Sequence, residues 1–172
     1  SFTVSELKEF TQRRGYIRDK ARPGEVTLRE VLLREWEIVQ TAKEGVGDCL
    51  PLVANPRPVN PQLDNEQRQA LESLLRSTNG VSVFRGGAGT GKSFVLRELV
   101  EQLRQSGRGV VVLAPQRQQV VEMEKAGFLS PTTVASFLAK GELADSAVIV
   151  VDEAGQIGGR QMLELVRLIH ER

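Results

Sequence analysis

The chain has 172 residues, of which 40% are apolar and 26% charged, and its formal net charge is +1. This length suits one ordinary domain with a small appendage, and the composition favours a packed core and excludes a largely disordered chain. No apolar run reaches the roughly 20 residues that cross a bilayer, and the single cysteine, Cys49, cannot form an internal disulfide. We therefore expect a soluble, cytoplasmic protein without a membrane partner. The net charge leaves nucleic-acid binding open, because such binding needs only a local basic track.

The two ends of the chain indicate a fragment. The chain opens at Ser1 without an initiating methionine and stops at Arg172 inside a predicted helix that has no stop signal after it. We therefore expect a piece excised from a longer protein. His170, the only histidine, lies in this last helix, and no neighbour in the sequence makes it a metal ligand or a base.

The first 60 residues carry mainly helical signals. Ser5–Phe10 is a short amphipathic stretch, and Thr27 and Glu30 have the spacing of a capping box ahead of a longer helix. Four apolar residues fall on one face of that helix: Leu28, Leu32, Trp36 and Val39. We interpret this stripe as a packing surface rather than a platform on which bases stack.

A proline-bearing connection follows this helix. Its prolines are Pro51, Pro56, Pro58 and Pro61. Such spacing is typical of an extended connection, because proline supplies no backbone N–H to a helix or sheet. We therefore divide the chain into a helical segment with its connection, residues 1–60, and a second unit, residues 61–172.

A basic run lies near the N-terminus, opposed only by Asp19. Its members are Arg13, Arg14, Arg18, Lys20 and Arg22. Such a run can follow nucleic-acid phosphates, or it can be an ordinary solvated face. Tyr16 is the only aromatic residue within it, so both interpretations stay open.

The second unit alternates predicted helices and strands. Asp64 can cap a first helix that runs to about Arg76, with Gln67 at the reciprocal capping position. Apolar, β-branched-rich runs without polar alternation predict buried parallel strands at Val81–Phe84, Val110–Leu113 and Ala147–Val151. The predicted helices between them are Lys92–Gln105, Pro115–Lys125 and Thr132–Lys140. This order predicts an α/β domain with a parallel sheet and right-handed crossovers.

A phosphate-binding loop follows the first predicted strand. It consists of Gly86, Gly87, Ala88, Gly89, Thr90, Gly91, Lys92 and Ser93, which match the P-loop pattern at every required position. Glycines let successive backbone N–H groups curl around phosphate oxygens, and the helix that follows adds the positive end of its dipole. We expect Lys92 to reach the β and γ phosphates of ATP and the Ser93 hydroxyl to ligate Mg²⁺.

An acidic pair ends the last predicted strand. Asp152 and Glu153 follow the apolar run Val148–Val151, as in a Walker B motif. In a parallel sheet the end of this strand and the P-loop lie at the same edge, so Asp152 can approach the Mg²⁺ held by Ser93. Glu153 is then placed to orient or deprotonate the water that attacks the γ-phosphate. These residues predict hydrolysis as well as binding.

Together these residues resemble motifs I and II of superfamily 1 helicases of the RecD-like branch. The resemblance implies a RecA-like P-loop NTPase domain. It also gives Gln67 the role of reading the adenine edge, although simple helix capping remains an alternative for this side chain. Val112–Pro115 is similar to the motif in which a strand end and the next loop touch single-stranded DNA, and Thr132–Phe137 is similar to the following DNA-facing motif.

A narrower resemblance concerns the helicase part of MobF-type conjugative relaxases. It rests on Val151–Gly155 through Gly159–Met162 and on the Thr27–Glu35 helix ahead of the proline-bearing connection. The chain departs from that family at Gln116, where the family has a small or hydroxyl residue, and it lacks the tyrosine and histidine cluster of the relaxase half. The resemblance implies an ATP-dependent helicase that acts on single-stranded DNA with ATP and Mg²⁺.

Two other functions share some of these features. A P-loop kinase or clamp-type ATPase would carry motif I, but it would not call for the glutamine-bearing segment Leu63–Gln67. A degenerate module used for DNA docking or assembly would not need Lys92, Ser93, Asp152 and Glu153 all intact. Stimulation of ATP hydrolysis by single-stranded DNA would separate a motor from both alternatives.

The resemblance also predicts an incomplete sheet. RecA-like motors insert the strand that follows Walker B between the Walker A and Walker B strands, and here that strand would begin beyond Arg172. We therefore expect either direct pairing of Val81–Phe84 with Val148–Val151, or a gap between them that another chain fills. The arginines that stabilise the transition state would lie on a second RecA-like domain, so we expect the fragment alone to be inactive.

Overall fold

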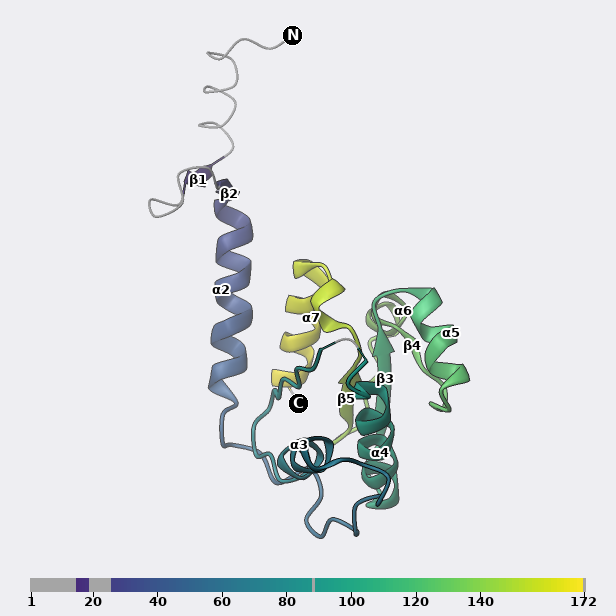
Figure 1. Ribbon diagram of the computed structural model, residues 1–172. Helices are drawn as coiled ribbons and strands as arrows, with labels where there is room; N and C mark the ends of the chain where they lie inside the picture. Colours follow the sequence, from purple (N-terminus) through teal and green to yellow (C-terminus); the bar gives the residue numbers. More distant parts are fainter. Residues whose placement is uncertain (1–14, 19–25, 88, 172) are drawn as a thin grey trace.

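The computed structural model describes residues 15–18, 26–87 and 89–171 of the chain (Figure 1). In chain order the elements are β1 (Tyr16–Arg18), β2 (Val26–Leu28), α2 (Arg29–Glu44), α3 (Asn65–Leu75), α4 (Lys92–Gln105), β3 (Val110–Ala114), α5 (Arg117–Lys125), β4 (Thr132–Thr133), α6 (Val134–Lys140), β5 (Val148–Val151), the 3₁₀ turn η1 (Ala154–Gln156) and α7 (Gly159–His170). Ser5–Phe10 and the basic residues of the N-terminal run, apart from the backbone of Arg18, lie outside the described residues.

The central sheet is parallel and has the strand order β4-β3-β5. Successive side chains of a strand point to opposite faces, and both faces of this sheet are covered. Val112 and Val150 belong to one apolar cluster, whereas Leu113 and Ile149 belong to the other. Burial on both faces explains why β3 and β5 are continuous apolar runs, and it confirms the predicted α/β fold with a parallel sheet.

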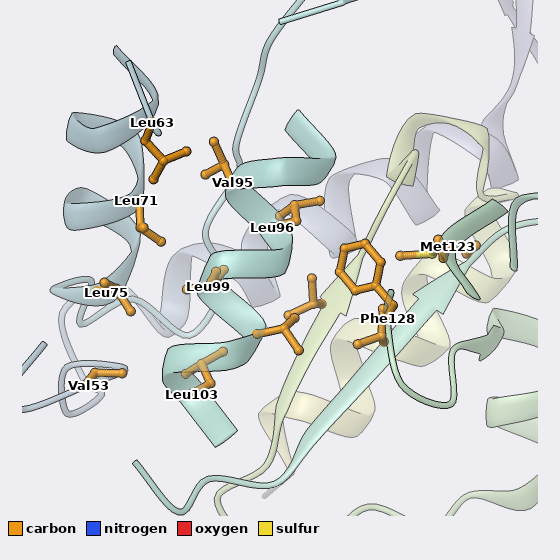
Figure 2. Packing of buried hydrophobic residues seen from close by; sticks show 14 of the residues in the cluster. Val53, Leu63, Leu71, Leu75, Val95, Leu96, Leu99, Leu103, Met123 and Phe128 are labelled. Atoms are coloured by element: carbon orange, nitrogen blue, oxygen red, sulfur yellow. The ribbon is translucent and has the colours of Figure 1, made fainter. Parts of the chain in front are cut away.

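The larger cluster lies between the sheet and the helices α3 and α4 (Figure 2). Leu71 and Leu75 of α3 meet Val95, Leu99 and Leu103 of α4, and all five side chains are buried. The smaller cluster is formed on the other face by residues of α6 and α7 against β3. The larger cluster therefore fixes α4, whose N-terminus carries the P-loop lysine, against the sheet.

The core predicts a large stability effect at Leu103, which is fully buried. We expect Leu103→Ala to lower the free energy of unfolding by about 2–5 kcal/mol, because it removes buried apolar contacts and leaves a cavity. Leu50→Ala is the matched control, since Leu50 is 79% exposed and should change stability by about 0.5 kcal/mol or less. Urea unfolding followed by circular dichroism measures both, and equal stabilities of the two variants would contradict this packing.

The N-terminal part departs from the sequence prediction in three ways. β1 and β2 pair in an antiparallel arrangement that the sequence analysis does not predict. The capping box at Thr27 is wrong, because Thr27 lies in β2 and the helix N-cap is Leu28, which has no side-chain cap bond. The packing interpretation of the apolar stripe is also wrong within this chain: Trp36 is 62% exposed, and Leu32 and Val39 are exposed too.

The apolar stripe of α2 is exposed because the helix meets the rest of the protein with its opposite side. Helix α2 contacts α7, the yellow helix beside it in Figure 1. The contact includes an ion pair between Arg167 and Glu37 and a 3.6 Å approach of His170 Nε2 to Glu44 Oε2. Helix α2 thus meets α7 with a side that includes these polar contacts, and the face with Trp36 points away.

The predicted strand at Val81–Phe84 is also wrong. These residues form no strand, and Val83 is 77% exposed, although Phe84 packs against the larger cluster. A strand requires a neighbour that shares its backbone hydrogen bonds, and within the described residues β5 pairs with β3 alone. Direct pairing of Val81–Phe84 with β5 is therefore excluded in this structure, and filling of the gap by another chain stays a prediction.

Candidate nucleotide-binding site

The N-terminus of α3 is held by the predicted capping box. The Gln67 backbone N–H donates to Asp64 Oδ1 at 2.8 Å, and the Asp64 N–H donates to Gln67 Oε1 at 3.1 Å. The other end of the Gln67 amide is used as well, because its Nε2 donates to the Thr90 carbonyl at 3.0 Å. Gln67 therefore caps its own helix and also ties α3 to the P-loop. Whether it reads adenine stays a prediction.

The P-loop needs glycine at several places for physical reasons. Gly89 and Gly91 have φ angles of 76° and 72°, in the left-handed region that glycine adopts without strain. A Cβ on Gly91 would lie 2.5 Å from Gln67 Nε2, and a Cβ on Gly86 would lie 2.7 Å from Thr90 Oγ1. The glycines thus allow the loop to fold tightly onto itself and onto α3. Ala88, also predicted to bind nucleotide, lies outside the described residues.

The lysine of the loop faces the loop's own backbone. Lys92 Nζ donates to the carbonyls of Gly86 and Gly87 at 2.8 and 3.1 Å, and Thr90 Oγ1 donates to Gly87 at 2.9 Å. Lys92 is also the first residue of α4, whose N-cap, Gly91, makes no side-chain cap bond. Amide groups of the first helical turn and the ammonium group therefore gather at one place, which suits a phosphate.

This geometry predicts a specific loss of binding in Gly86→Ala. The added Cβ would lie 2.7 Å from Thr90 Oγ1 and 3.0 Å from Lys92 Cγ, so Lys92 has to move. Displacement of one charge-assisted hydrogen bond, about 1.5 kcal/mol, should weaken ATP binding about tenfold. Gly158→Ala is the matched control because a Cβ there meets no atom within 4 Å. Titration with a fluorescent ATP analogue compares the two, and equal affinities would contradict this account of the loop.

The acidic pair lies at the carboxyl end of β5. The Asp152 N–H donates to the Leu113 carbonyl at 3.0 Å, which extends the ladder with β3 by one bond. The Glu153 N–H donates to Asp152 Oδ1 at 2.9 Å, and Glu153 is exposed with φ of 51°. A non-glycine residue in this region is uncommon, and such strain persists where neighbouring structure imposes it.

The side chains available at this site bear on whether it can hold Mg²⁺. Among the described residues no group of three or more histidine, cysteine, aspartate or glutamate side chains could hold a metal by itself. Ser93 stands in the first turn of α4, and α4 contacts β5, whose last residue, Val151, directly precedes Asp152. One hydroxyl and one carboxylate suit an ion whose other ligands are phosphate oxygens and water, as is usual for Mg²⁺. The residues therefore fit a nucleotide-borne magnesium rather than a metal caged by protein.

The two segments predicted to face DNA occupy the same edge of the sheet. Val112–Pro115 ends β3, and Thr132–Phe137 comprises β4 and the start of α6. Thr133 caps α6 by accepting from the Ser136 N–H at 3.1 Å. Because all three strands are parallel, both segments lie at the edge where Asp152 follows β5.

The sequence does not predict the contacts between the start of α5 and the 3₁₀ turn η1, which follows the acidic pair. Gln119 and Gln156 hydrogen-bond to each other across 37 residues of sequence. One local signal exists: Gln116 and Gln119 have capping-box spacing at the start of α5, and that capping box is present in the structure. The partner in η1 could not be found from spacing, because the contact depends on how the fold brings the two turns together.

A P-loop at the start of a helix, a parallel sheet buried on both faces and an acidic pair at the strand end define the class of P-loop NTPase domains. A comparison with family models adds a family to this class assignment. Residues 62–172 match the model of an AAA domain family, and the chain belongs to that family. The match begins just before the Asp64 cap and includes the P-loop and the acidic pair.

One similar protein gives a finer indication. Over 73 residues the chain is 40% identical to the ATP-dependent DNA helicase PIF1 of Candida albicans. The aligned part covers 41% of this chain but only 8% of that helicase. Together the two findings support a superfamily 1 helicase-like P-loop domain.

None of the helices in residues 15–18, 26–87 and 89–171 combines the length and the apolar character needed to span a bilayer.

Proposed function

We propose that this chain is the ATP-binding part of an ATP-dependent DNA helicase or translocase. The observation that carries the proposal is the P-loop, with Lys92 and Ser93 at the start of α4, in a domain whose sheet presents Asp152 and Glu153 at the same edge as two loops similar to DNA-facing motifs. The similarity to a DNA helicase supports DNA as the partner. The second unit, residues 61–172, is the motor domain in this proposal.

Each site residue has a distinct role in the proposed reaction. Lys92 exchanges its bonds to Gly86 and Gly87 for bonds to the β and γ phosphates, which carry more negative charge than a carbonyl. The loop N–H groups from Gly87 to Ser93, including those of Ala88, Gly89, Thr90 and Gly91, surround the phosphates. Gln67, at the edge of the loop, recognises the adenine edge with its side-chain amide, whose Nε2 has a second N–H besides the one that bonds the Thr90 carbonyl.

The acidic pair and Ser93 have the remaining roles, which are to bind magnesium and to activate water. Ser93 and Asp152 would hold Mg²⁺, which neutralises charge on the phosphates. Glu153 is exposed at the end of β5, where its carboxylate can accept a proton from the attacking water. No such base is needed for storage of a nucleotide, so the pair favours hydrolysis.

The finer proposal is that the longer protein is a conjugative relaxase-helicase. It rests on the resemblance of Val151–Gly155 and Gly159–Met162 to the helicase part of MobF-type relaxases. If it is right, the gene that encodes this chain also encodes a domain with a catalytic tyrosine and a histidine cluster. Sequencing of the whole gene tests this, and a gene without such a domain would limit the proposal to a helicase.

The test of the main proposal is ATP hydrolysis with and without single-stranded DNA. It uses a longer chain that adds the second motor domain, measured by phosphate release with saturating oligothymidylate. We expect DNA to raise kcat at least about tenfold, which corresponds to about 1.4 kcal/mol of added transition-state stabilisation. Hydrolysis that is equally fast with and without DNA would instead favour a P-loop ATPase of another class. Absence of hydrolysis together with intact DNA binding would favour a degenerate docking module.

A further inference from the structure

Three glutamines join the loop after β3 to the turn after β5. Gln119 Nε2 donates to Gln156 Oε1 at 3.0 Å, and Gln116 Nε2 approaches the same oxygen at 3.4 Å. Gln116 and Gln119 stand at the start of α5, whereas Gln156 ends η1. We call these three residues the glutamine link. One acceptor thus receives both amides, and the link connects two segments that are 37 to 40 residues apart in sequence.

On one side the glutamine link reaches Glu153 through a single short turn. The Gln156 backbone N–H donates to the Glu153 carbonyl at 2.9 Å, and Glu153 is the N-cap of η1. Glu153 is held at φ of 51°, a conformation that needs support from its surroundings. Two bonds to the side chain of Gln156 supply such support, because they fix the far end of the turn. The side-chain bonds of Gln156 therefore bear on the same short turn that begins at Glu153.

On the other side the link sets the shape of the loop after β3. Gln119 Oε1 accepts from the Gln116 backbone N–H at 3.0 Å, so the side chain that donates to Gln156 also caps α5. Val120, next to Gln119, is fully buried, so this helical turn is anchored in the core. Gln116 itself follows Pro115 directly and is exposed. A ligand that moves Gln116 thus acts on the same amide group that holds Gln156.

We propose that Gln116, Gln119 and Gln156 are positioning residues that convey the state of the loop after β3 to Glu153. This inference rests on the proposed function, in which that loop meets single-stranded DNA and Glu153 acts on the attacking water. Gln116 and Gln156 are exposed and Gln119 is half-buried, so water competes for these bonds and the link can break and form again. DNA at the loop selects one arrangement of the link, and that arrangement places the carboxylate for hydrolysis.

The experiment measures DNA-stimulated ATP hydrolysis in the longer chain that contains the second motor domain. Gln156→Met keeps the length of the side chain but removes the acceptor, and Gln119→Glu keeps the acceptor that caps α5 but removes the donor to Gln156. We expect each to lower kcat with saturating oligothymidylate by about tenfold, the order of effect seen for residues that couple two sites. The KM for ATP should change by about twofold or less, because no phosphate contact is altered.

Three further variants make the result specific. Gln156→Glu retains an oxygen that can accept both bonds, so it should keep kcat within about threefold of wild type. Gln118→Met is the matched control on the same helix, since the Gln118 side chain bonds Glu122, at 3.4 Å, rather than Gln156, and it should behave as wild type. The double variant with Gln119→Glu and Gln156→Met should be no worse than either single variant, because both break one link.

The outcomes separate the inference from the proposed function. Wild-type kcat in Gln156→Met and Gln119→Glu, or a rise in KM without a fall in kcat, would overturn the role of the glutamine link while the motor function stands. A loss in Gln156→Glu as large as that in Gln156→Met would overturn it too, because the acceptor would then not matter. A wild-type protein whose hydrolysis does not respond to DNA would instead refute the proposed function on which the inference rests.

Discussion

Glu153→Gln is expected to lower kcat by about 10²–10⁴ while nucleotide affinity stays within about twofold. The amide has nearly the shape of the carboxylate but cannot accept a proton from water at neutral pH. Glu153 donates its backbone N–H to Asp152 and its carboxylate is exposed, so the substitution leaves the proposed magnesium ligand in place. The measurement is phosphate release in the longer chain beside a titration of a fluorescent ATP analogue. Glu124→Gln is the control, because Glu124 is an exposed residue near the far end of α5.

Lys92→Ala is expected to weaken nucleotide binding, in contrast to Glu153→Gln, which lowers kcat. The ammonium group, which now bonds Gly86 and Gly87, would be lost from the phosphate site. A hydrogen bond to a charged group contributes about 1.5–3 kcal/mol, so affinity should fall roughly 10- to 150-fold. Lys125→Ala, at the end of α5, should bind as wild type does. Equal losses of binding in Lys92→Ala and Glu153→Gln would refute the separate roles that we give to these residues.

The chain of 172 residues by itself is expected to hydrolyse ATP only at a trace rate. Several arginines in the described residues are already bonded away from the P-loop: Arg97 to Ala126, Arg104 to Leu129, Arg108 to Pro51 and Arg167 to Glu37. Arg85 precedes the loop and Arg117 begins α5, on the side proposed for DNA. We therefore expect none of these arginines to stabilise the charge that develops on the γ-phosphate.

An arginine supplied from a second domain raises kcat by about 10³–10⁵ in related reactions. We therefore expect phosphate release from this chain to be at least about a thousandfold slower than from a chain that adds the second motor domain. The two proteins are compared at saturating Mg-ATP with and without oligothymidylate. DNA-stimulated turnover of about one per second or faster by the 172-residue chain would show that no second domain is needed, and would contradict the proposed architecture.

Local signals explain which parts of the site could be predicted. The Asp64–Gln67 capping box and the bounds of α4 follow from residues within one or two helical turns, and the structure has both. The strands β3 and β5 could be predicted because burial on both faces demands an uninterrupted apolar run. The P-loop has a pattern that few other loops share, although the roles of its residues stay predictions.

The failures share a different cause. Val81–Phe84 has the composition of a strand, but the strand state depends on a neighbour that the described part of the chain does not supply. The stripe with Trp36 has helical periodicity, but periodicity does not say which partner the face meets, and α7 takes the opposite side of α2. The bond of Gln67 to Thr90 and that of Gln119 to Gln156 join segments that are distant in sequence. No local sequence pattern therefore predicts these two bonds.

We expect this chain to bind ATP at the P-loop, and a titration of the chain with a fluorescent ATP analogue measures that binding. Wild type and Lys92→Ala are compared with and without Mg²⁺, and unlabelled ATP is used as competitor. Binding should be saturable and Mg²⁺-dependent, unlabelled ATP should displace the analogue, and Lys92→Ala should weaken binding roughly 10- to 150-fold. A folded wild-type chain that binds no nucleotide would contradict ATP binding at the P-loop. Equal affinities of wild type and Lys92→Ala would contradict it too.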